Sequence, residues 1–210
     1  MADYTLRLVK GSELTFNEAD NNFINAKTTG EFVGNQIIKP PSGFYVDQSF
    51  GSSSLTNSSV SATDLIRIYP FITGYSLNID EINCWQTTAT AISLSYVIYE
   101  SDADNLPSGR LLETTPISSS AGTNPVSVSF SFNANQVYWV GMVTDGLATF
   151  RSVPQDSLRS LPYDRLNTTG VVNSLSVAYV APGSAPSTWP SFSYTQATVG
   201  DGPKIYFRVA

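Results

Sequence analysis

The feature that most constrains this chain is a strict alternation of apolar and polar side chains between residues 126 and 133. The apolar positions are Val126, Val128, Phe130 and Phe132, and Ser or Asn follows each of them. Successive side chains of a strand point to opposite faces of a sheet, so the pattern predicts a β-strand with one buried face. Residues 92–98 alternate in the same way. Residues 137–143 are apolar on both faces, which indicates a central strand.

Similar strand signals recur from about residue 64 to the C-terminus, separated by loops rich in Gly, Pro, Asn and Asp. Roughly eight strands without helices between them predict a mainly β fold, an antiparallel β-sandwich of jelly-roll type. The alternation slips by one residue between Ile79 and Ile82, so we expect a β-bulge near Asp80 and Glu81. Cys84 fits a small buried hydrophobe in a strand.

The first 35 residues differ from the rest, because a short strand and a turn precede a capping box that starts at Thr15. The helix that follows carries one apolar stripe, formed by Phe16, Ala19, Phe23 and Ala26. A helix of ~12 residues is marginal alone, so its stripe must pack on something. We expect residues 1–35 to dock on other chains or on copies of themselves; packing against the sandwich is the alternative. Residues 36–62, rich in Pro, Gly and Ser, read as a linker, and residues 63–210 as the sandwich domain.

Composition argues against several functions. The charge balance of 11 basic and 17 acidic residues gives −6 without a basic cluster, so we expect no nucleic-acid binding. The chain has no histidine and one cysteine, which removes His-based catalytic triads, disulfides and multi-cysteine metal sites. We therefore expect no enzyme activity, cofactor or metal. No stretch approaches the ~18–20 apolar residues of a membrane helix, and residues 1–20 resemble no secretion signal, which points to synthesis in a cytoplasm.

Two clusters remain as candidate sites. Residues 102–105 place three oxygen-bearing side chains close together, but Asp and Asn also favour turns, and we expect a plain turn rather than a calcium site. Aromatic rings in loops are the second candidate, because exposed rings stack on sugars. These rings are Trp189, Tyr163 and Tyr194. The alternative is an aromatic plug that closes one end of the sandwich. Trp85 and Trp139 lie in strand patterns and are expected in the core.

Residues 6–23 combine a strand, a Lys-Gly-Ser turn, a Leu-Thr helix start and a Glu-x-Asp-x-Asn-Phe pattern. This order resembles a motif near the start of many tailed-bacteriophage fibre and appendage proteins. In that family the segment implies attachment to the virion or assembly of a fibre. Residues 69–72, 97–109, 137–146 and 186–190 resemble a β-sandwich module of phage and prophage tail proteins.

The resemblance implies a virion protein made in the host cytoplasm, with other virion proteins as partners and a homotrimer as the usual fibre assembly. We expect a short fibre or appendage subunit that adheres to a host-surface glycan. The alternative is a head decoration protein, or a tail or baseplate connector, with no ligand. The resemblance supplies no catalytic residue.

Overall fold

A computed structural model describes residues 39–47, 56–60, 65–153, 175–178, 181–190, 195–196 and 202–210. The chain divides into two units, Met1–Lys39 and Pro40–Ala210, and every described residue except Lys39 belongs to the second. The helix expected near the N-terminus therefore lies outside the described residues. The same is true of these candidate residues: Phe16, Ala19, Phe23, Ala26, Tyr163 and Tyr194.

Within the described residues the chain forms fifteen strands and no helix. The strands are β1 (Tyr45–Asp47), β2 (Thr56–Val60), β3 (Leu65–Ile72), β4 (Leu77–Gln86), β5 (Ser93–Ser101), β6 (Pro107–Glu113), β7 (Ile117–Ser118), β8 (Gly122–Thr123), β9 (Val126–Phe132), β10 (Val137–Thr144), β11 (Ala148–Val153), β12 (Leu175–Ala178), β13 (Thr195–Gln196), β14 (Gly202–Pro203) and β15 (Ile205–Val209).

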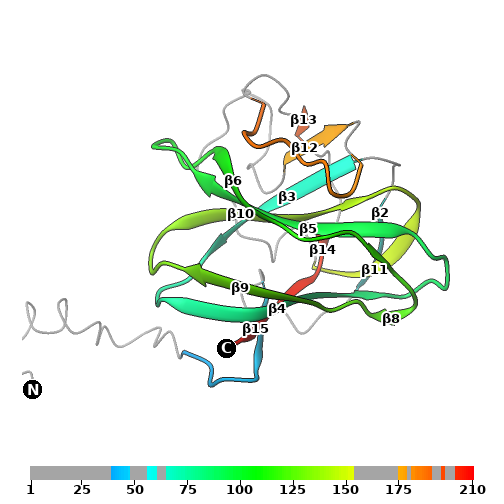
Figure 1. The fold of residues 1–210 in the computed structure, drawn as a ribbon, viewed down its shortest axis with the longest axis horizontal. Coiled ribbons are helices and arrows are strands. Elements are labelled where there is room, and N and C mark those ends of the chain that lie inside the picture. The colour runs from blue at the N-terminus through cyan, green and yellow to red at the C-terminus, as the bar shows by residue number, and fades with distance from the viewer. Residues whose placement is uncertain are drawn as a thin grey trace, which may run out of the picture. The chain divides into compact units, whose positions relative to one another are not determined.

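The strands form two antiparallel sheets (Figure 1). The first sheet has the order β1-β15-β4-β11-β14, with β2 beside β11, and β8 and β9 beside β4. The second sheet has the order β13-β12-β3-β10-β5-β6, with β7 beside β5. The expected antiparallel sandwich is confirmed.

The connections are those of a jelly roll. From β2 the chain crosses to β3, returns to β4, crosses to β5 and β6, and then alternates through β9, β10 and β11. The orders β2-β11-β4-β9 and β3-β10-β5-β6 result, and they describe two interlocked Greek keys. β1, β15 and β12 extend this frame, with β15 running along β4.

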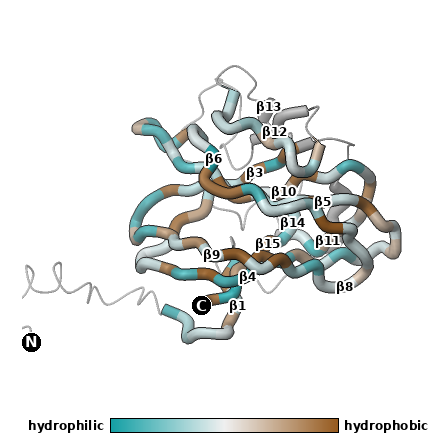
Figure 2. Tube along the Cα trace, in the orientation of Figure 1, coloured by the Kyte–Doolittle hydropathy of each residue, from teal (hydrophilic) through white to brown (hydrophobic). Residues whose placement is uncertain are grey.

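Apolar side chains from both sheets meet between the layers. Phe71 of the second sheet packs its ring 4.8 Å from that of Phe132 and 4.9 Å from that of Phe207, which both belong to the first sheet. The alternation expected in β9 is confirmed, since its apolar residues pack on this core and its serines are exposed. Figure 2 shows apolar and polar residues alternating along β4 and β9. The expected central strand is β10, which pairs with β3 on one side and β5 on the other.

The β-bulge expected near Asp80 is present. The register of β4 shifts between Ile79 and Glu81 opposite β9, and a matching shift occurs opposite β15 between Arg208 and Val209. The extra residue lets Ile79 and Ile82 both face the core although three positions separate them. It therefore decides which side chains of the rest of β4 point outward.

Parts of the interval 36–62, which we expected to be a linker, are strands. β1 pairs with β15, and β2 pairs with β11 over five residues. The described residues of this interval thus add to the first sheet. The physical reason is that β11 and β15 would otherwise present unpaired backbone N–H and C=O groups along these edges.

Candidate functional site

The outer faces of the two sheets differ in kind. The outer face of the second sheet is apolar and is covered by residues 181–190, hereafter the covering segment. Ala185 and Trp189 of this segment are buried on an apolar cluster that comprises Ile66, Ile68, Val97, Tyr99, Leu106, Trp139 and Val143. This face is therefore a second small core.

Trp189 is held firmly in this cover. Its backbone N–H donates to the carbonyl of Ser108 at 2.7 Å, and its ring stands edge-on to Tyr99 with the centroids 5.2 Å apart. Only 3% of the residue is exposed. Trp189 therefore offers no free ring face to a sugar, and it packs on the sandwich, as the alternative to glycan binding predicted. Its exposure could not be inferred from a loop position, because a loop that covers an apolar sheet face buries its own aromatics.

The outer face of the first sheet, hereafter the open face, carries polar, charged and aromatic side chains. Arg208 of β15 pairs through Nε with Asp80 at 2.7 Å and through an η nitrogen with Glu81 at 2.9 Å. Lys204 pairs with Asp47 at 2.8 Å. These ion pairs link β1 to the residue that precedes β15, and β4 to the end of β15.

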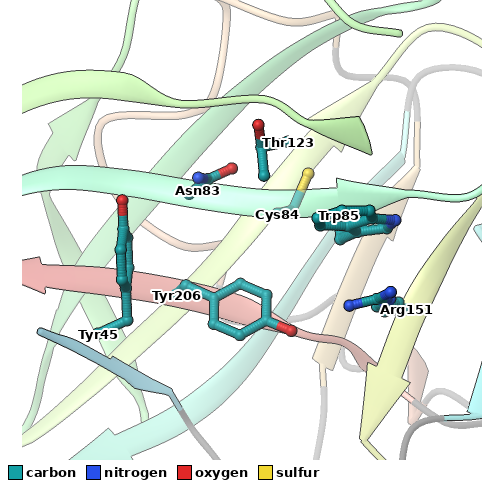
Figure 3. Close-up of a pocket in the computed structure, with 7 residues that line it drawn as sticks. All are labelled: Tyr45, Asn83, Cys84, Trp85, Thr123, Arg151 and Tyr206. Atoms are coloured by element: carbon teal, nitrogen blue, oxygen red, sulfur yellow. The ribbon is translucent and has the colours of Figure 1, made fainter. Parts of the chain in front are cut away.

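Three rings on this face surround a pocket of about 280 Å³, hereafter the aromatic pocket. Figure 3 shows Tyr45, Tyr206 and Trp85 in order across β1, β15 and β4, with Arg151 of β11 beside Trp85. The lining consists of Tyr45, Asn83, Cys84, Trp85, Thr123, Arg151 and Tyr206. The volume falls near the lower end of the ~300–1,000 Å³ typical of small-molecule pockets.

The side chains of Trp85, Tyr206 and Arg151 face outward because their neighbours along the strands are buried. Cys84 and Gln86 are fully buried on either side of Trp85, so the indole must point to the open face. Tyr206 lies between the buried residues Ile205 and Phe207. Arg151 likewise lies between two buried neighbours in β11.

The rings are tied into a network with the nearby charges. The hydroxyl of Tyr45 donates to Glu81 Oε1 at 2.7 Å, and its ring stands at 90° to that of Tyr206 with 6.5 Å between the centroids. The Arg151 guanidinium carbon lies 4.0 Å from the centroid of the Trp85 ring. Lys204 Nζ lies 5.4 Å from the centroid of Tyr206. Cations over ring faces are favourable and fix the orientation of both partners.

Three side chains of the lining, Tyr45, Cys84 and Tyr206, are neutral at ordinary pH. The hydrogen bond to Glu81 raises the pKa of Tyr45, and burial raises the pKa of Tyr206. Both phenols thus keep their protons and remain hydrogen-bonding groups. Burial raises the pKa of the Cys84 thiol to about 12. Because the nucleophilic form is the thiolate, this thiol is inert, in agreement with its expected role as a buried hydrophobe.

The arrangement suits binding of a small polar ring. Two phenol rings and an indole supply apolar surface with polar rims, and Asn83, Thr123 and Arg151 are polar groups around them. Asn83 is itself fixed, since its Oδ1 accepts from the backbone N–H of Asn124 at 2.9 Å. No carboxylate belongs to the seven lining residues. The pocket is therefore equipped for recognition.

Sequence analysis did not predict this site. We expected Trp85 in the core, but it is partly exposed and lines the pocket, whereas Trp139 is fully buried as expected. Tyr45 lies within residues 36–62, which we expected to be a linker. A usable signal did exist: once Ile82 and Cys84 face inward, Trp85 at the next position must face outward.

Residues 102–105 form the expected turn. Asp102 Oδ1 accepts from the backbone N–H groups of Asp104 and Leu106, both at 2.9 Å. Asn105 adopts a positive φ of 59°, a conformation that Asn tolerates. In the part of the chain that the structure describes, no three Asp, Glu, Cys or His side chains gather as metal ligands.

The same part of the chain contains no helix long and apolar enough to cross a membrane. No protein-family model matches this chain, and no curated protein matches it by sequence.

Proposed function

We propose that this chain is a bacteriophage virion protein, a short fibre or appendage subunit, whose sandwich domain binds a sugar unit of a host-surface glycan in the aromatic pocket. The observation that carries the binding function is the set of three rings, Tyr45, Tyr206 and Trp85, around one pocket on an otherwise polar sheet face. The resemblance of residues 6–23 to the phage attachment motif supports the virion assignment. Assembly as a homotrimer with other virion proteins belongs to the same proposal.

The contrast between the two outer faces supports this choice of site. Where the sandwich has an apolar outer face, the covering segment seals it. On the open face Tyr45 is 47% exposed, and Trp85 and Tyr206 are partly exposed. Large aromatic surfaces that stay accessible beside polar groups are typical of ligand sites.

A pyranose ring has the matching chemistry. Its C–H faces pack on aromatic rings, and its hydroxyls bond to side chains at the rim. The Tyr45 hydroxyl already donates to Glu81, so its lone pairs remain to accept a bond from the ligand. A single sugar unit matches a pocket of about 280 Å³ better than a long polymer does.

Binding is tested on a glycan array with the full-length chain and its Tyr45→Ala and Trp85→Ala variants. If an aromatic contact contributes ~0.5–1.5 kcal/mol beyond its buried area, each variant should bind about 2- to 12-fold more weakly. Phe44→Ala is the matched control, because Phe44 is a 62% exposed ring next to Tyr45 that does not line the pocket.

Equal binding by all variants would place any glycan elsewhere. An array without any signal would favour the alternative function, a decoration or connector protein without a ligand. The virion assignment is tested separately, by mass spectrometry of purified particles of the phage that encodes the chain. Absence of the chain from those particles would refute it.

A further inference from the structure

Arg151 is the one charged side chain among the described residues that line the pocket, and it lies over the ring of Trp85 and beside the hydroxyl of Tyr206. The other basic side chains of the open face are engaged differently. Lys204 is paired with Asp47, and Arg208 is paired with two carboxylates of β4. Arg151 instead lies over the ring of Trp85, at the wall of the pocket.

A guanidinium over an aromatic ring uses its face and keeps its edge for other partners. Its N–H donors lie in the plane of the group, in a fork that matches the two oxygens of a carboxylate. The indole shields one side of the group from water, and the buried neighbours Phe150 and Ser152 fix the strand that carries it. Arg151 is thus oriented to form a two-point contact with an anion inside the pocket.

The charges around the pocket do not oppose such a ligand. The chain as a whole carries −6, which would repel an anion at long range. On the open face, however, Asp47 is paired with Lys204, and Asp80 and Glu81 share Arg208, all at 2.9 Å or less, so these five groups leave one negative charge that Arg151 balances. Charges beyond ~8–10 Å are largely screened at physiological salt. Arg151 lies in the pocket lining itself and is therefore the charged group nearest to a bound ligand among the lining residues.

We propose that the aromatic pocket selects an acidic sugar, a uronic or nonulosonic acid unit, whose carboxylate is bound by Arg151 while its ring packs on the neighbouring aromatics. This inference rests on the proposed function, because it names the class of sugar that the same pocket binds. The alternative is a purely structural role for Arg151, in which it holds β11 against Trp85 of β4 and binds no carboxylate.

The test uses polygalacturonate, hyaluronan and polysialic acid, each beside a form whose carboxylates have been reduced to primary alcohols. Reduction removes the charge and keeps the ring stereochemistry. We expect the wild-type chain to bind at least one acidic form about tenfold or more tightly than its reduced form. Arg151→Gln should bind both forms with the same weak affinity, and Arg151→Lys should recover only part of the preference, because Lys lacks the planar fork.

Arg208→Gln is the matched control. It removes the same charge from the same face outside the pocket lining and leaves two carboxylates there unpaired, so the preference for the acidic form should be weakened but should remain, unlike in Arg151→Gln. A structural role for Arg151 predicts instead that Arg151→Gln weakens binding of the acidic and reduced forms equally.

Three results would overturn the inference. The wild type could bind acidic and reduced forms equally, Arg151→Gln could weaken binding of both forms by the same factor, or only neutral glycans could bind. In each of these cases the pocket would still be a sugar site, and Trp85→Ala would still reduce binding. An array on which no glycan of any kind binds refutes the proposed function itself, and the inference with it.

Discussion

Replacing Trp189 with alanine tests how the second sheet is closed. The indole is 3% exposed and lies edge-on to Tyr99, at a centroid distance of 5.2 Å, over the outer face of the second sheet. The covering segment has further anchors around it: the Tyr99 hydroxyl donates to the carbonyl of Pro186 at 3.0 Å, and Ala185 N–H donates to Glu113 Oε1 at 3.0 Å. The substitution should therefore leave a cavity beneath a segment that stays largely in place.

The size of the expected loss in the free energy of unfolding follows from the burial of the Trp189 side chain. A buried aromatic removes ~150–250 Å² from water, which corresponds to ~4–6 kcal/mol at ~25 cal/mol per Å². That value is an upper bound, and measured Trp→Ala or Phe→Ala costs are ~3–5 kcal/mol. The buried Nε1–H of Trp189 has no acceptor among the described residues, and its removal returns ~1–3 kcal/mol. We therefore expect a loss of about 3 kcal/mol in the free energy of unfolding.

Urea unfolding followed by far-UV circular dichroism measures this loss. With a slope of about 2 kcal/mol per molar urea, the midpoint should fall by about 1.5 M. Trp189→Phe is the control: it keeps most of the packing and removes the unpaired N–H, so its midpoint should stay close to that of the wild type. A Trp189→Ala midpoint equal to that of the wild type would refute the buried position of the ring.

Two further predictions concern the strands. Gly141→Ala in β10 should lower the free energy of unfolding by about 2 kcal/mol or more, measured by urea unfolding. The added methyl group meets the backbone oxygen of Arg67 in β3, so the two strands must separate. An unchanged urea midpoint would contradict this packing. Burial raises the pKa of Tyr96 above its usual value of about 10, so the stability it contributes is present below pH ~10 and is lost as the pH rises above that value. The urea midpoint should therefore fall as the pH rises above ~10, and Tyr96→Phe should flatten this fall. The variant also loses the bond from the Tyr96 hydroxyl to the carbonyl of Asn124. An equally steep fall in the variant would assign the effect to other groups.

Local patterns in the sequence were enough to predict the long inner strands and their buried faces, but not β1 and β2. The alternation in residues 126–133 identifies β9, and the apolar run that begins at Val137 identifies the central strand β10. The one-residue slip after Ile79 locates the bulge at Asp80. These features are predictable because side-chain direction along a strand has a period of two, and a bulge interrupts that period by one residue.

Only the tertiary structure decided which outer face is covered and which is open. The alternation of a strand says which residues share a face, but not what packs on that face. From its place in a loop, Trp189 could be either exposed or packed on the sandwich, and the structure buries it. Trp85 was expected in the core because it lies in a strand, but it is partly exposed and lines the pocket. The pocket itself joins Tyr45, Trp85, Arg151 and Tyr206, which come from four strands. These residues lie close together because strands distant in the sequence pair with one another, and such pairing leaves no periodic signal in the chain. The sequence therefore determined the layers of this protein, and the pairing of distant strands determined its candidate site.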